Sequence, residues 1–434
     1  MTSCDLSGRR AGPNARGMNR GRLLRLVGLL TLAPVLAGPA AVAHPVAATA
    51  PSVERAALNQ RVFDRVWNEV RRNYYDPRLH GMDWEAARRT YRPQAVAATD
   101  ERALYRVLNA MLELLADGHA AASSPAAVRR DALKHEERAV MGMTLVMQNH
   151  DPDHWRIERI RPGSPAEAAG LQVGWVLDSV DGEPWGPEAV VEDGRPVRLR
   201  LTDETGALRE VGLTPRIMPA PDYFSADRSR PGVLVLRIEA FDEGLGQWMG
   251  RQLEGLPAGT DVVLDLRSNP GGRLDEAEAV LTCFLPRGQA WATRTGRNGR
   301  AVTLRTLGDC GGRVRPATND LAVLVDDGSR SAAELTPAAL QEAGRAVVVG
   351  ETTGGSVLIA QDADLPDGGR LTLSRADFVT RRGVRLEKRG VTPDIAAPRT
   401  LAERRAGQDP ALETAIRALS EDGQTARTQA ATIR

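Results

Sequence analysis

The first third of the chain has apolar residues at helical spacing. They recur every three or four positions over residues 54–74 and again over 103–115, and Asp100 precedes the second run as a candidate N-cap. A polar, arginine-rich stretch of helical character follows over residues 126–138. We therefore predict an N-terminal helical region over residues 54–135.

The pattern changes after residue 138. The stretch AVMGMTLVM is strand-like, and further short strands surround a Pro-Gly turn, a short alanine-rich helix and a turn at Asp181-Gly182. The sequence RPVRLRLTDETGALREVGLTP predicts a hairpin that turns at Thr205-Gly206. These features predict a compact β module over residues 139–216.

From Gly232 onward, strand and helix patterns alternate. VLVLRI, DVVLDL and LAVLV contain Val, Leu and Ile without alternation, which is typical of strands buried on both faces. Helices are expected over residues 275–284 and around Ala338. A β/α core is thus predicted over residues 217–400, followed over 401–434 by one helix near residues 410–419 and a polar tail. The fold class is multidomain α+β.

The first 43 residues have the features of an export signal. Six arginines form a positively charged segment, an apolar stretch follows over residues 26–36, and residues 41–43 (Ala-Val-Ala) offer a small-residue cleavage site. A membrane anchor is the alternative, but Pro34, Gly38 and Pro39 interrupt the apolar run well short of a membrane span. We expect export to the periplasm or extracellular space, with no stable membrane span after signal cleavage.

Charge and cysteine content narrow the function classes. The 57 basic and 56 acidic residues give a net charge of +1, which argues against nucleic acid as the main partner. Cys4 precedes the signal, so the exported chain would keep Cys283 and Cys310, either as a disulfide or as two buried thiols. With no CxxC and only scattered histidines, no metal site and no cofactor are predicted.

Residues 324–357 show a strand, two serines, a helix and a second strand. This order presents a nucleophile in many folds, and Ser331 is the candidate, although serine is also a favoured helix N-cap. Ser329 is the weaker candidate and is expected to shape the turn. A serine needs a base to accept its proton at neutral pH, so the chain must supply one.

Several ordered motifs resemble peptidase family S41, which includes the C-terminal processing and tricorn-like proteases. They are GSRSAAE, VGETTGG, PDGGRLTLS, GVTPDI and DLRSNPGG, and residues 142–182 are similar to a PDZ domain. FDRVWNEVRRNYYDPRLHGMDW resembles the helical region of that family, so the likeness covers roughly residues 55–400. It implies a PDZ-like β module, a crotonase/ClpP-like β/α protease core, and protein or peptide substrates.

The resemblance places the nucleophile at Ser331. The processing proteases use a lysine 25 residues later as the base, but this chain has Ser356 there. Lys134 and Lys388, its two lysines, match no such position. A Ser–Lys pair is therefore not expected.

The tricorn-like branch uses a histidine from the helical region, and LADGHAAASSP places His119 there. A neutral imidazole is a competent base near pH 7. In that branch a serine before the histidine links it to a glutamate, which would be Glu387, but Gly118 replaces that serine. Asp117 is a second candidate to orient His119. The simpler interpretation of His119 is a polar residue that ends a helix. The simpler interpretation of Asp117 and Glu387 is that each forms an ion pair at the surface.

Backbone donors complete the predicted site. Gly271, Gly272 and Ala332 are the candidates for the oxyanion hole, with an ordinary tight turn as the alternative for the two glycines. In the PDZ-like module, Gly142, Met143, Thr144 and Leu145 are the candidate peptide-binding loop. Trp175 stands where such modules usually have aspartate, and it would either block or line the groove.

The leading hypothesis is an exported serine endopeptidase that uses Ser331, His119 and Glu387. The alternative is a catalytically inactive peptide-binding protein on a degenerate S41 fold, which the replacements at positions 118 and 356 favour. The sequence leads to no prediction of oligomeric state.

Overall fold

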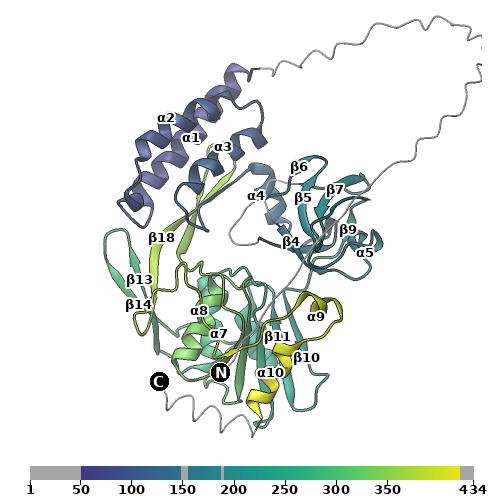
Figure 1. Cartoon of the computed structure of the whole chain (residues 1–434). Coiled ribbons are helices and arrows are strands. Elements are labelled where there is room, and N and C mark those ends of the chain that lie inside the picture. Colours follow the sequence, from purple (N-terminus) through teal and green to yellow (C-terminus); the bar gives the residue numbers. More distant parts are fainter. Residues whose placement is uncertain (1–49, 148–154, 187–189, 421–434) are drawn as a thin grey trace, which may run out of the picture. The chain divides into compact units, whose positions relative to one another are not determined.

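The computed structural model describes residues 50–147, 155–186 and 190–420 (Figure 1). The predicted export signal and the polar C-terminal tail lie outside the described residues. No helix within the described ranges has both the length and the apolar character needed to cross a membrane.

Three helices and one short turn of helix form the N-terminal region: α1 Val53–Asn73, η1 Leu79–Gly81, α2 Trp84–Ala97 and α3 Glu101–Glu113. The apolar stripes of α1 and α3 pack together around Phe63, Val66, Leu104 and Leu108. Asp100 caps α3 by accepting a hydrogen bond from the N–H of Ala103, as the pattern predicted. The sequence pattern did not single out α2, because few of its residues are buried.

The β module consists of β3 Met143–Met147, β4 Trp155–Ile160, β5 Val176–Val180, β6 Glu183–Pro184, β7 Val197–Thr202, β8 Leu208–Leu213 and α5 Pro165–Ala168. Its sheet has the order β3-β4-β5-β7-β8, with β6 paired to β5. The predicted hairpin is β7–β8. The predicted strand over 139–147 is instead two strands, β2 Arg138–Val140 and β3, because Gly142 breaks it with φ 88°.

A six-stranded sheet lies at the centre of the core, in the order β10-β11-β12-β15-β16-β19. The strands are β10 Phe224–Asp227, β11 Val233–Ile238, β12 Asp261–Asp265, β15 Leu321–Val325, β16 Val347–Gly350 and β19 Ile395–Ala396. All neighbours after β10 are parallel. Carboxyl ends of parallel strands share one sheet edge, which brings the turns after β12 and β15 together.

Helices cover both faces of this sheet (Figure 1). One set of strand residues packs against α6 Leu245–Leu253, α7 Leu274–Phe284 and α8 Ala332–Glu342. The alternate set, including Val233, Val263 and Leu324, packs against α10 Pro410–Leu419. Burial on both faces agrees with the unbroken apolar runs in the sequence.

A second sheet connects the helical region to the core. It contains β13 Ala290–Gly296, β14 Ala301–Arg305, β17 Ile359–Asp364, β18 Arg370–Thr380 and β1 Ala121–Ser123. β1 follows the N-terminal helices in the chain yet pairs with β18, so that Ala121 lies opposite Thr372. The remaining elements are α4 Pro125–Ala132, β9 Arg216–Met218, which pairs with β2, and α9 Leu401–Arg405.

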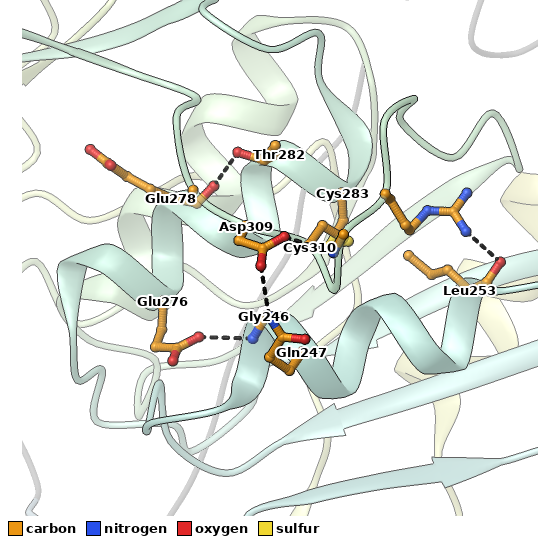
Figure 2. The surroundings of a disulfide bond; sticks show 12 residues. Gly246, Gln247, Leu253, Glu276, Glu278, Thr282, Cys283, Asp309 and Cys310 are labelled. Carbon is orange, nitrogen blue, oxygen red and sulfur yellow. Dashed lines mark hydrogen bonds between the residues drawn. A yellow bond between two sulfur atoms is a disulfide. The ribbon is translucent and has the colours of Figure 1, made fainter.

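A disulfide joins Cys283 at the end of α7 to Cys310 in the loop before β15 (Figure 2). Both residues are buried. This loop lies so close to α6 that a Cβ on Gly250 would come within 2.6 Å of the Cys310 carbonyl oxygen, so only glycine fits there. Gln247 of α6 donates to Asp309 at 2.7 Å, which ties the loop to the helix a second time (Figure 2).

Candidate active site

Ser331 has a strained backbone. It lies between β15 and α8, as the N-cap of α8, with φ 55° and ψ −119°. Such a conformation is costly for a residue with a side chain and is found mainly where function requires it. A Cβ on Gly271 would lie 2.6 Å from the Ser331 Cβ, so the glycine turn after β12 packs directly against this serine.

The buried carboxylate of Glu334 holds the Ser331 turn in place. It accepts hydrogen bonds from the N–H groups of Ser331 (3.0 Å), Gly355 (2.7 Å) and Ser356 (2.8 Å), and from the Thr353 hydroxyl (2.5 Å). Burial raises the pKa of this carboxyl, although these hydrogen bonds oppose that effect. Glu334 therefore fastens the loop after β16 to the turn that carries Ser331.

A second buried carboxylate joins the turns after β12 and β15. Asp326 accepts from the N–H of Ser268 at 2.7 Å and from its hydroxyl at 3.1 Å. Ser329 is fully buried, and its hydroxyl donates to the Leu266 carbonyl at 2.9 Å. Ser329 thus shapes the turn, in keeping with its expected role.

The candidate oxyanion donors differ from one another. The Gly271 N–H already donates to the Asn269 side chain at 2.8 Å, so in this structure it is not available, contrary to the sequence prediction. Gly272 has φ 139°, and a Cβ there would lie 2.3 Å from the Phe241 carbonyl oxygen. The Ala332 N–H lies at the first turn of α8, and a Cβ on Gly271 would be 3.1 Å from its nitrogen. With the Gly271 N–H already in use, Ala332 and Gly272 remain as the candidate donors.

His119 lies in the turn between α3 and β1. Its backbone N–H donates to Asp117 Oδ1 at 2.9 Å. Asn109 of α3 holds β1 through two hydrogen bonds with the backbone of Ala122, at 3.0 and 2.7 Å. Because β1 also pairs with β18, the histidine turn is held between the helical region and the core.

The His119 ring lies beside Asp117 in a buried setting. Nδ1 is 3.9 Å from Asp117 Oδ1, and the two side chains are 18% and 1% exposed. Both Nδ1 of His119 and Oδ2 of Asp117 are buried without a hydrogen-bond partner. Burial lowers the pKa of His119, the carboxylate of Asp117 opposes this, and the nearby Arg330 guanidinium lowers it further.

Glu387 is close enough to Asp117 for the two charges to interact. Its carboxylate accepts the N–H of Val357 at 2.9 Å, and burial, together with the charge of Asp117, raises its pKa. The charges that shift the pKa of His119 are those of Asp117 and Arg330. The hydroxyl of Tyr74 also lies by Asp117, which helps to raise the tyrosine pKa. Of the two candidate acids, Asp117 is the one beside the imidazole.

A cavity of about 960 Å³ joins these parts. His119, Ser268, Pro270, Arg330 and Ser356 all line it. Ser331 is not among the lining residues, but Arg330 precedes it in the chain and the Ser356 carbonyl accepts its N–H at 2.8 Å. Among the described residues no hydrogen bond joins Ser331 to His119. Such catalytic contacts are often long in the absence of substrate.

The predicted peptide-binding loop approaches the same cavity. Gly142 packs on α5, where a Cβ would be 2.1 Å from that of Ser164, and Met143 begins β3. Thr144 and Leu145 line the cavity. Among the described strands, β3 pairs with β4 alone and so lies at an edge of its sheet. Trp175 does not line the cavity, and its indole N–H donates to Glu204 at 2.8 Å.

Comparisons with known proteins match this arrangement. Residues 232–397 match the model of peptidase family S41, and residues 56–113 match the tricorn protease C1 domain. The chain is 28% identical over 355 residues to the carboxyl-terminal-processing protease of Picosynechococcus, covering 78% of this chain and 83% of that protein. The chain contains a peptidase family S41 domain. It is a serine-type peptidase, a hydrolase that acts on protein substrates.

Other proteins with the same kind of activity in their names are also similar to this chain. The carboxyl-terminal-processing protease of Synechocystis is 27% identical over 363 residues, which cover 79% of this chain and 82% of the relative. The photosystem II D1 C-terminal processing protease has a TM-score of 0.59 at 24% identity, over 84% of this chain and 98% of that one. The tricorn protease has a TM-score of 0.51 at 18% identity, over 85% of this chain and 37% of that one. These two likenesses establish the fold.

Sequence reasoning about this S41 peptidase missed several residues of the site. Asn109 lies among the residues of a helix and Asp326 directly follows a buried strand, so neither stood out in the sequence. Arg330 lies inside the quoted serine motif, and its position between two serines was the available signal. In the part of the chain that the structure describes, no cluster of three or more His, Cys, Asp or Glu is arranged to hold a metal ion.

Proposed function

We propose that this S41 peptidase is an exported endopeptidase in which Ser331 is the nucleophile and His119 the general base. The observation that carries the proposal is the strained conformation of Ser331 at the start of α8, against Gly271. Strain at a helix N-terminus is typical of a nucleophile that must expose its hydroxyl. An ordinary helix cap requires no positive φ.

In the proposed reaction, the Ser331 Oγ bonds to the peptide carbonyl carbon while its proton moves to Nε2 of His119. The imidazolium then gives that proton to the leaving amine as the C–N bond breaks, and water hydrolyses the acyl-enzyme by the same steps. The N–H groups of Ala332 and Gly272 stabilise the oxyanion. Asp117 supports the imidazolium from the Nδ1 side, 3.9 Å away in this structure.

Glu387 has a different place in this proposal from the one that the family resemblance implied. Without a serine at position 118 there is no relay from Glu387 to the ring. Glu387 instead holds the backbone after Ser356 through the Val357 N–H. We assign it to positioning the loop beside the nucleophile.

Peptide delivery involves the PDZ-like module. The open edge of β3 accepts an extended chain by strand addition, and Thr144 and Leu145 of that strand line the cavity that His119 faces. Gly142 and Met143 form the loop at the start of the edge. By analogy with its carboxyl-terminal-processing relatives, the peptidase acts near the C-termini of exported proteins.

The inactive alternative rests on the replacements at positions 118 and 356. A fluorophosphonate probe distinguishes the two functions, since it reacts only with an activated serine. We expect covalent labelling at Ser331, its loss in Ser331→Ala, and its retention in the matched variant Ser356→Ala. Absence of labelling in the wild-type protein, together with no cleavage of denatured casein, would favour the inactive peptide-binding protein.

A further inference from the structure

The turn that follows α1 has a strained backbone. Leu79 and His80 have φ 50° and 54°, although neither is glycine. Such conformations are costly for residues with a side chain and persist where the surroundings enforce them, often at functional sites. Here the Asp76 carboxylate enforces the turn by accepting the N–H groups of Arg78 (3.0 Å) and His80 (2.8 Å). The turn thereby holds the His80 ring against the end of α1.

Both nitrogens of the His80 ring have partners. Nδ1 lies 3.3 Å from Asp76 Oδ2, and Nε2 lies 3.2 Å from the Tyr74 hydroxyl. Because an ionised carboxylate only accepts hydrogen bonds, the neutral imidazole carries its hydrogen on Nδ1, and Nε2 accepts from a tyrosine. The Tyr75 hydroxyl is farther from Nε2, at 3.4 Å, and itself accepts from Arg385 at 3.4 Å. Tyr74 is therefore the nearer donor to His80.

The Tyr74 hydroxyl also lies close to Asp117. The tyrosine is fully buried, and burial, followed by the charge of the Asp117 carboxylate, raises its pKa. Asp117 Oδ2 is buried and has no hydrogen-bond partner. A tyrosine hydroxyl carries a single hydrogen, so it donates to His80 or to Asp117 but not to both. The hydrogen bond in the structure is the one with His80.

Other charged groups near this cluster have partners of their own. Arg385 donates to Asp377 at 2.9 Å, and Glu387 accepts the N–H of Val357 at 2.9 Å. Asp117 Oδ2, in contrast, is left without a donor. Whether Tyr74 supplies one depends on the competing acceptor.

The charge of Asp117 acts directly on the proposed base. Its Oδ1 lies 3.9 Å from Nδ1 of His119. Burial lowers the pKa of His119, the Asp117 carboxylate raises it, and Arg330 lowers it further. A hydrogen bond from Tyr74 would draw on the same carboxylate charge and weaken its support of the imidazolium.

We propose that His80 and Tyr74 are positioning residues for the base: His80 holds the Tyr74 hydroxyl hydrogen away from Asp117, which keeps that carboxylate free to support the imidazolium of His119. This inference rests on the proposed function and adds two residues that act through Asp117. Neither residue is assigned a contact with the substrate.

Asparagine and glutamine separate the roles of the two ring nitrogens. Asparagine carries a polar atom near the place of Nδ1 and tolerates a positive φ, whereas glutamine reaches the place of Nε2. At pH 8, where an ordinary imidazole is neutral, His80→Asn should lower kcat/KM about tenfold, which corresponds to one pKa unit of imidazolium stability. His80→Gln should recover most of that loss.

A second substitution distinguishes this role from a structural one. In a Tyr74→Phe background there is no hydroxyl hydrogen to release, so His80→Asn should change kcat/KM by less than about twofold. In the control background Tyr75→Phe, which removes the more distant hydroxyl, the full loss should remain. Equal losses from His80→Asn with and without the Tyr74 hydroxyl would overturn the proposal, as would the absence of any loss in the otherwise unchanged protein.

NMR of the His119 ring gives a readout that does not depend on turnover. Full-length protein is labelled with ¹³C-histidine, and the His119 signal is assigned by its loss in His119→Gln. Adding Tyr74→Phe to His80→Asn should raise the pKa of His119 by about one pH unit, because Asp117 regains its full charge. An unchanged pKa would contradict the positioning role. If wild type does not react with fluorophosphonate but the pKa follows this pattern, the proposed function fails and the positioning of Asp117 stands.

Discussion

The two halves of the candidate site are built differently. On the nucleophile side, four donors converge on the buried Glu334 carboxylate, and Asp326 joins the two neighbouring turns. On the histidine side, Nδ1 of His119 and Oδ2 of Asp117 are buried and have no hydrogen-bond partner. The turn of the proposed nucleophile is preorganised, whereas the proposed base and Asp117 remain 3.9 Å apart.

This difference indicates which side of the candidate site we expect to move when substrate binds. A short movement of the α3–β1 turn would bring Nδ1 and the Asp117 carboxylate into contact and satisfy two buried polar atoms at once. The nucleophile turn has no comparable freedom, since moving it would break several hydrogen bonds. Substrate binding should therefore reshape the histidine side.

The largest effect is expected from removing the base. His119→Ala should reduce kcat/KM on the order of 10²–10⁴-fold, because His119 is the proposed acceptor of the serine proton. Its thermal stability should stay close to that of wild type, since the mostly buried ring makes no side-chain hydrogen bond. Steady-state kinetics on a single peptide measure the loss. A His119→Ala enzyme with near-normal turnover would remove histidine from the mechanism.

Breaking the nucleophile side should cost stability as well as activity. Glu334→Ala leaves four donors without their acceptor, and each such buried group costs about 1–3 kcal/mol, so we expect a loss of roughly 4 kcal/mol or more. Urea denaturation measures it, and Glu334→Gln, which keeps one acceptor oxygen, should lose less. Equal stability of Glu334→Ala and wild type would mean that the turn is not held as described.

Removing the disulfide tests stability apart from the site. The bond closes a separation of 27 residues, which the loop-entropy model values at roughly 3 kcal/mol. The paired Cys283→Ala and Cys310→Ala variant should unfold at lower urea but keep the pH profile of the folded enzyme. Non-reducing mass spectrometry of fresh protein provides the direct check, and two alkylatable thiols would count against the bond.

The charges around His119 should shift the pH profile in opposite directions. Burial lowers its pKa, so kcat/KM should rise with pH below the ordinary value of about 6.5. Asp117→Asn removes a charge that favours the imidazolium, so the rise should move to lower pH and the rate should fall about tenfold. Arg330→Gln removes a charge that disfavours it, so the rise should move to higher pH.

The same pH profiles decide between the two acids. Glu387→Gln should move the rise less than Asp117→Asn does, because Asp117 is the acid beside the ring. A larger shift from Glu387→Gln would restore the relay that the resemblance implied. A flat profile from pH 5 to 9, in an enzyme that still needs Ser331, would exclude an imidazole base.

The smallest effect is expected at Ser356. Its contacts with the Ser331 turn are made by backbone groups, a carbonyl that accepts from Ser331 and an N–H that donates to Glu334. Ser356→Ala should therefore keep turnover within a few-fold of wild type. A dead Ser356→Ala enzyme beside an active His119→Ala enzyme would reverse the assignment of the base.

The sequence alone determined the features that depend on neighbouring residues. Apolar periodicity predicted α1, α3 and the doubly buried strands, Asp100 predicted a helix cap, and the order of strand, serine and helix placed Ser331 at the start of α8. These patterns are local because helices and strands are fixed by spacing along the chain.

Only the tertiary structure decided which distant groups meet. The pairing of β1 with β18, the contact of Glu387 with the Val357 backbone rather than with the His119 ring, and the effect of Arg330 on His119 all follow from the docking of separate elements. Electrostatic and hydrogen-bonding partners depend on distances in space and on burial. For residues more than two hundred positions apart, spacing along the chain predicts neither their distance in space nor their burial.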